Sequence, residues 1–113
     1  MINQALDQHS TKPTQCELCD RQETLTRHHL IPRTHHRRKI FVKRFSRQEM
    51  THSILWLCRP CHSHIHVAFS ERDLGLKYNS REALLSCQII AEFVSWIKDK
   101  PVGFKPKSNR NRW

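Results

Sequence analysis

The hydrophobic and polar positions along the chain predict two short strands separated by a long polar segment. Residues 24–30 are rich in β-favouring side chains and end just before Ile31 and Pro32, where proline disfavours continuation. Residues 54–57, Ile-Leu-Trp-Leu, are a second apolar run of strand length. We therefore expect two strands far apart in sequence.

Helices are predicted mainly after the second strand. Residues 46–49 match a capping box that starts a short helix, and residues 60–69 fit a helix with proline in its first turn. Residues 70–73 resemble another capping box, and Gly75 is expected to stop that turn. From Asn79 to about Lys98, apolar residues at helical spacing predict one or two packing helices.

The length and composition limit the size of the core. The chain has 113 residues, of which 37% are hydrophobic, so a metal or disulfide staple is expected. We predict an irregular arm over residues 1–14, one domain over residues 15–100, and a basic tail over residues 101–113 that is disordered or ordered only on a partner.

Targeting features point to the cytoplasm. No apolar run approaches the roughly 20 residues of a membrane helix. The first 14 residues contain no apolar stretch typical of a secretory signal. We expect a cytoplasmic protein without a membrane partner.

The charge points to a polyanionic partner. The chain carries 20 Lys and Arg against 10 Asp and Glu, and residues 24–48 hold eight basic residues and no acidic one. The basic stretch from Arg33 to Arg47 and the basic tail are expected to bind nucleic-acid phosphates without reading sequence. Phe41, Phe45 and Trp56 could stack on bases, although core packing is the first expectation for Trp56.

Four of the five cysteines form two Cys-x-x-Cys pairs, Cys16 with Cys19 and Cys58 with Cys61. In a reducing compartment this pattern favours metal binding over disulfides, and four thiolates suit a closed, structural zinc site. We interpret Cys87 as a small buried apolar residue.

Four histidines lie near the two cysteine pairs in the sequence. His62 and His66 are four residues apart, so on a helix they share one face and can bind one ion. His28 and His29 are adjacent in the first predicted strand, where successive side chains point to opposite faces. A zinc ion bound by the two cysteine pairs is expected to bring these four histidines together.

The motifs resemble the HNH nucleases of the ββα-metal type over roughly residues 16–66. They are Cys16-Glu17-Leu18-Cys19, Leu25-Thr26-Arg27-His28-His29-Leu30-Ile31-Pro32 and Leu57-Cys58-Arg59-Pro60-Cys61-His62-x-x-Ile65-His66. The resemblance implies an α+β fold with a small treble-clef-like ββα core stapled by the four-cysteine zinc site, followed by further helices.

By the same resemblance, His29 is expected to be the general base, and His28, His62 and His66 are expected to bind one divalent ion, similar to the colicin DNase branch. The family's asparagine is replaced here by Ser53, which can still hydrogen-bond backbone.

The expected function is metal-dependent hydrolysis of phosphodiester bonds, with DNA as the first expected substrate. An all-imidazole site suits Zn²⁺, Ni²⁺, Co²⁺ or Mn²⁺ better than Mg²⁺. Mg²⁺ can still support the reaction if water and phosphate oxygens complete its coordination shell. Arg33 is the first candidate to clamp a phosphate.

Alternatives from other classes remain. The first is a non-catalytic zinc module that binds nucleic acid. A zinc peptidase is disfavoured because Ser63, not glutamate, follows His62. A toxin delivered by a separate partner is the third.

Overall fold

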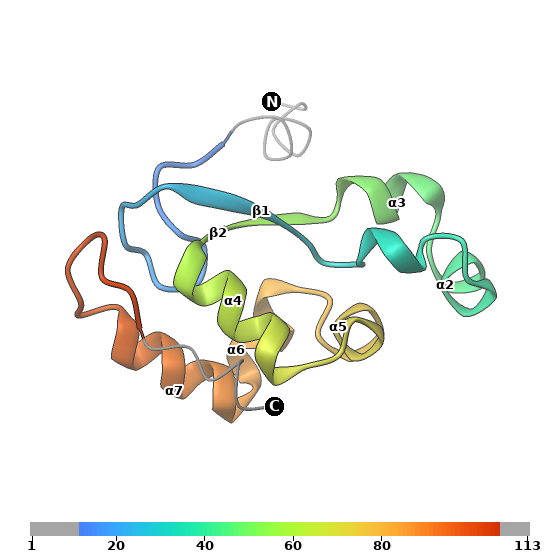
Figure 1. The fold of residues 1–113 in the computed structure, drawn as a ribbon. Coiled ribbons are helices and arrows are strands. Elements are labelled where there is room, and N and C mark those ends of the chain that lie inside the picture. Colours follow the sequence, from blue (N-terminus) through green and yellow to red (C-terminus); the bar gives the residue numbers. More distant parts are fainter. Residues whose placement is uncertain (1–11, 107–113) are drawn as a thin grey trace.

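Two antiparallel strands form the sheet of the molecule (Figure 1). In the computed structural model, which describes residues 12–106, β1 (Leu25–His29) pairs with β2 (Ile54–Cys58). Leu25 lies opposite Cys58, and His29 lies opposite Ile54. Both strands lie where the sequence predicts them. Most of the predicted arm, and residues 107–113 of the predicted tail, fall outside the described residues.

Helix α4 (Arg59–Ala68) follows β2 directly and has Pro60 in its first turn, as predicted. It lies between the sheet and α7 (Gln88–Ile97), so the centre of the molecule is built in three layers (Figure 1). The main core joins both strands, α4 and α7 through fully buried residues such as Leu57, Ile65 and Ile90. This small α+β arrangement holds one face of α4 against the strands.

The predicted helical segment after residue 79 is two helices, α6 (Arg81–Ser86) and α7. The N-cap of α6 is Ser80, whose hydroxyl accepts a hydrogen bond from the backbone N–H of Ala83. No helix within residues 12–106 has the length and apolar character needed to cross a bilayer.

The basic segment between the strands folds into short helices at one end of the sheet (Figure 1). These are a 3₁₀ turn (Arg33–His35), α2 (Lys39–Arg44) and α3 (Arg47–His52). The capping box predicted at α3 is confirmed, since Ser46 and Glu49 exchange side-chain to backbone hydrogen bonds. Helix α2 is not among the predicted elements.

Two predictions about this region are wrong, and the position of the Phe41 ring in α2 explains both. The ring is fully buried with Ile31 and Met50 in a second small core, so it is not available to stack on bases. Helix α5 (Glu71–Lys77) runs through Gly75 instead of stopping there. Gly75 is buried against the same ring, and a Cβ atom at this position would lie 2.5 Å from Phe41 Cε1.

We expect Gly75→Ala to lower the melting temperature. Overpacking a filled core typically costs about 1–3 kcal/mol, which outweighs the roughly 1 kcal/mol that alanine gains over glycine in a helix. Ser95→Ala, at an exposed position of α7, is the matched control. Thermal denaturation of both variants checks this, and an unchanged midpoint for Gly75→Ala would show that the Phe41 ring yields freely.

Candidate functional site

The four cysteines of the two motifs meet at one end of the sheet. Cys16 and Cys19 lie in the turn before β1, Cys58 ends β2, and Cys61 is in the first turn of α4. All four are buried, and their sulfur atoms lie within 4.8 Å of one another. The Sγ atoms of Cys19 and Cys58 are 3.7 Å apart. Sulfurs bound tetrahedrally at about 2.3 Å from zinc are roughly 3.8 Å apart, so this cluster can hold a metal ion such as zinc.

The thiol pKa values show why a cation suits this cluster. Hydrogen bonds with Cys19, Cys58 and Cys61 hold the pKa of the Cys16 thiol far below its usual range. The pKa values of Cys58 and Cys61 are raised, chiefly by their hydrogen bonds with Cys16. Ionising one thiol therefore opposes ionisation of these two, and four thiolates at this spacing require a positive ion among them.

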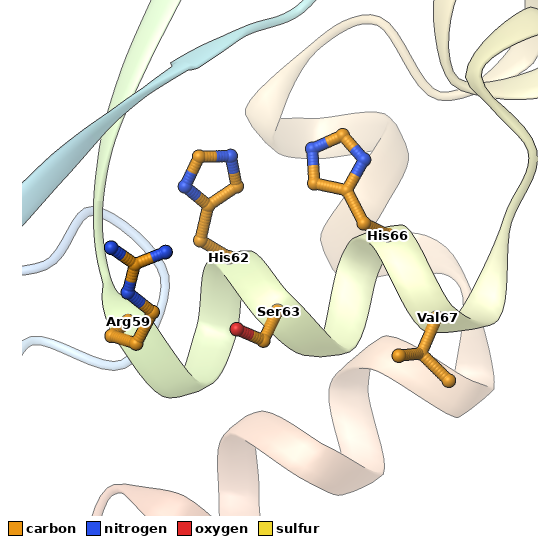
Figure 2. Close-up of a pocket in the computed structure, with 5 residues that line it drawn as sticks. All are labelled: Arg59, His62, Ser63, His66 and Val67. Carbon is orange, nitrogen blue, oxygen red and sulfur yellow. The ribbon is translucent and has the colours of Figure 1, made fainter. Parts of the chain in front are cut away.

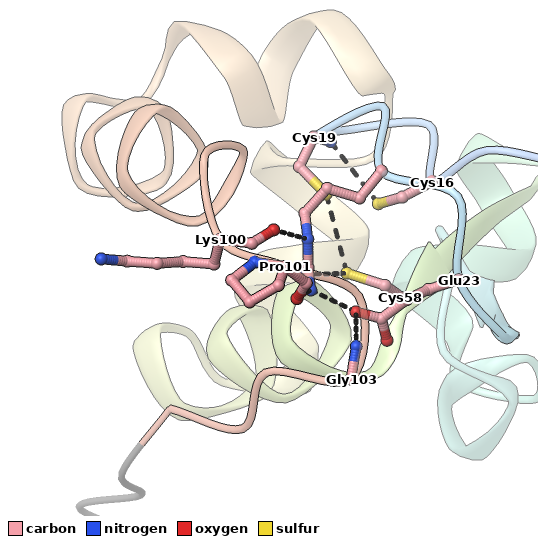
Figure 3. Close-up of polar contacts among 8 residues, drawn as sticks. Cys16, Cys19, Glu23, Cys58, Lys100, Pro101 and Gly103 are labelled. Carbon is pink, nitrogen blue, oxygen red and sulfur yellow. Dashed lines mark hydrogen bonds and ion pairs between the residues drawn. The ribbon is translucent and has the colours of Figure 1, made fainter.

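A buried arginine beside the cysteines was not singled out by the sequence. Arg21 Nη1 lies 3.8 Å from Cys58 Sγ, and its Nε and Nη2 donate to the carbonyls of Lys100 (3.1 Å) and Pro101 (2.6 Å). Arg21 also pairs with Glu23. These contacts attach Lys100 and Pro101, where the predicted domain ends and the predicted tail begins, to the cysteine cluster (Figure 3). The guanidinium also offsets negative charge on the sulfurs.

Three histidines form a second cluster between β1 and α4. The ring centroids of His28, His62 and His66 are 5.0–5.3 Å apart pairwise. One ring nitrogen from each lies within 4.8 Å of the others, a spacing that could hold a metal ion. His62 and His66 project from the same side of α4 (Figure 2), as their four-residue spacing predicts.

His28 is the most enclosed member of this histidine cluster. Its side chain is 1% exposed, and neither ring nitrogen has a hydrogen-bond partner among the described residues. Buried polar atoms are nearly always satisfied, so an orphaned imidazole facing two others fits a site that binds a cation.

All three rings favour the neutral form that ligates metals. Burial, followed by the neighbouring histidines, lowers the pKa of His28 to about 3. The pKa of His62 is lowered to about 4 by burial and then by His66. Partial burial of the ring also lowers the pKa of His66. Near neutral pH each ring therefore offers a lone pair.

His29 follows His28 on the strand but is more exposed and lies outside the three-histidine cluster. Its pKa is lowered by burial and then by the charges of Arg33 and Arg27. Arg33 itself is exposed on the 3₁₀ turn that follows β1. His29 is thus a partly accessible, neutral imidazole beside the cluster, with a cationic residue close by.

An open groove of about 220 Å³ runs along His62 and His66. Its other lining residues are Arg59, Ser63 and Val67 (Figure 2). No sequence pattern around Arg59, which immediately precedes Pro60, indicates that it lines a groove. It places a positive charge at one end of the groove.

The remaining candidates lie outside both clusters. Ser53 donates its hydroxyl to the Glu49 carbonyl (2.6 Å), and its own carbonyl accepts from the N–H of Leu30 (2.9 Å), so it joins α3 to the end of β1. His64 stacks on Phe93 with ring centroids 4.0 Å apart. Cys87 packs against the main core, apart from the other cysteines.

Similarity to a known protein defines the family. The uncharacterized protein YisB of Bacillus subtilis (strain 168) is 34% identical to the chain over 87 residues, which cover 76% of this chain and 75% of YisB. The chain belongs to the same family as YisB. No family model matches the chain. No solved structure matches it either.

Proposed function

We propose that the protein is a metal-dependent endonuclease of the HNH type, in which β1, β2 and α4 form the ββα-metal core. The observation that carries this proposal is the buried, unpartnered ring of His28 facing His62 and His66, with His29 next to it on the strand. Three neutral imidazoles beside a fourth, accessible one suit metal-assisted hydrolysis.

Each histidine has a separate role in this proposal. His28, His62 and His66 hold one divalent ion, which when bound supplies Lewis-acid charge for the phosphoryl oxygens. Neutral His29 accepts a proton from the attacking water. Arg33 and Arg59 lie at suitable places to bind phosphate oxygens, since one neighbours His29 and the other lines the groove.

Exposed basic residues support nucleic acid as the substrate. Seven Lys and Arg side chains between the strands are exposed, and none of the seven pairs with a carboxylate in the described part of the chain. They are Arg33, Arg37, Arg38, Lys39, Lys43, Arg44 and Arg47. The segment that carries them follows β1, which ends at His29, and its short helices α2 and α3 lie at one end of the sheet (Figure 1). Unpaired cations beside the site favour binding of a phosphate backbone.

A plasmid assay tests the proposal. The purified protein, incubated with supercoiled DNA and Mg²⁺, Mn²⁺, Ni²⁺ or Zn²⁺ in turn, should produce nicked and linear forms. His66→Ala should abolish cleavage, and because His66 is exposed the variant is expected to fold. His52→Ala, at an exposed position of α3, is the matched histidine control. Intact plasmid with all four metals, particularly if its gel mobility shifts, would instead indicate a non-catalytic binding module.

Arg33→Ala should move the acid limb of the pH–rate profile to higher pH. The positive charge of Arg33 lowers the pKa of His29, so His29 stays neutral and active to lower pH. Removing this charge raises the pKa of His29, so the cleavage rate begins to fall at a higher pH on acidification. Arg33→Lys should keep the native profile, and Arg37→Ala is the surface control. Superimposable acid limbs for Arg33→Ala and the native protein would contradict this electrostatic role.

A further inference from the structure

The hydroxyl of Thr26 lies between a backbone carbonyl and the ring of His62. Thr26 Oγ1 donates to the carbonyl oxygen of Leu57 at 2.8 Å and lies 2.7 Å from His62 Nδ1. Leu57 is also the residue opposite Thr26 in the strand pairing. The pairing of the strands therefore fixes the position of the hydroxyl, and the hydroxyl in turn contacts α4.

The proton count at this hydroxyl decides which His62 nitrogen carries hydrogen. A threonine hydroxyl has one proton, and the Leu57 carbonyl can only accept, so that proton is directed to Leu57. The short contact to His62 is favourable only if the ring nitrogen is the donor. His62 is therefore protonated at Nδ1, and the lone pair of its neutral ring is on Nε2.

We propose that Thr26 is a positioning residue that fixes the Nδ1–H tautomer and the orientation of His62, so that Nε2 is the atom offered to the divalent ion. The inference rests on the proposed function only in assuming that the histidine cluster binds metal. Thr26 and His28 are two residues apart on β1 and so share one face of the strand. One strand face thus provides one ligand directly and orients a second ligand on the helix.

Metal ligands commonly depend on such partners. A histidine that binds metal through one nitrogen usually donates its other N–H to an oxygen, and loss of that oxygen costs roughly 10- to 100-fold in metal affinity or activity. Thr26→Val keeps the shape and removes the oxygen, whereas Thr26→Ser keeps the oxygen.

The first test determines the tautomer of His62 in the native protein. In protein reconstituted with one equivalent of zinc, to fill only the cysteine cluster, ¹⁵N–¹H correlation spectra of the histidine rings near neutral pH should show His62 protonated at Nδ1. His62→Gln assigns its signal. A native His62 protonated at Nε2 would overturn the proposal whether or not the protein cleaves DNA.

The second test measures metal binding rather than activity. Calorimetric titration of Ni²⁺ into the same one-zinc protein should show affinity for Thr26→Val roughly 10- to 100-fold weaker than native, with Thr26→Ser close to native. Native affinity in Thr26→Val would overturn the positioning role. A folded native protein that binds Ni²⁺ with His62 protonated at Nδ1 but leaves plasmid intact would refute the nuclease proposal while leaving this inference standing.

Discussion

His29→Ala should reduce the rate of plasmid cleavage by roughly 10²- to 10⁴-fold, the usual contribution of a positioned general base. His29 is partly exposed and outside the three-histidine cluster, so its removal deletes a proton acceptor without deleting a ligand or a core side chain. The melting temperature and the amount of bound metal should therefore stay at native values. Single-turnover cleavage rates, with metal content measured on the same samples, check both parts.

Two outcomes would contradict this role. A native cleavage rate in His29→Ala would show that another group accepts the proton; one candidate is His36, whose ring centroid is 6.5 Å from that of His29. Loss of a metal ion in His29→Ala would instead make His29 a ligand. The comparison therefore separates a base from a ligand, which cleavage alone cannot do.

Cys58→Ser should unfold the domain or prevent its recovery. Cys58 is fully buried at the junction of β2 and α4, where it contacts both Cys19 and Arg21. Structural zinc contributes about 10–16 kcal/mol in small zinc domains near neutral pH, which is comparable to the roughly 5–15 kcal/mol by which a domain is stable. Losing most of that contribution leaves a core too small to compensate.

Cys87→Ser is the matched control, because it makes the same chemical change outside the cysteine cluster. It should retain zinc and a cooperative thermal transition, with only a modest loss of stability from the packing of Cys87 against the core. Circular dichroism melting and zinc content distinguish the two variants. A zinc-bound Cys58→Ser protein that melts like the native one would show that the cluster is not a structural metal site.

Local sequence signals predict the elements that depend on neighbouring residues. The capping box of α3, the proline start of α4 and the apolar run of β2 each lie within a few positions, and all three appear in the structure. Alternation along β1 likewise separates a buried His28 from a more exposed His29. The four-cysteine cluster follows from two motifs whose spacing already indicates a shared ion.

Elements that depend on distant residues were missed. Helix α2 contains Ile40 and Val42, which are poor helix formers, and is secured by one side chain, Phe41, in the second core. In the sequence Gly75 is typical of a helix end. In the structure its lack of a side chain leaves space for the Phe41 ring. Both errors involve the packing of this one ring, which lies in a core with Ile31 and Met50 and against Gly75, more than 30 residues away.

The residues that contact the two clusters could not be predicted from sequence patterns either. Thr26 meets His62 across 36 positions, and Arg21 meets Pro101 across 80. Threonine and arginine carry no motif of their own here. Only the two-residue offset between Thr26 and His28 on one strand could have marked Thr26 as a neighbour of the histidine cluster.

The metal content of the purified protein tests the central claim of two metal sites most directly. Elemental analysis of native protein supplied with Zn²⁺ or Ni²⁺ should find two ions per chain before dialysis against a chelator and one afterwards, because the cysteine cluster is closed and the histidine cluster opens to a groove. His66→Ala should hold one ion throughout. A single ion per native chain before chelation, or two ions in His66→Ala, would contradict the account.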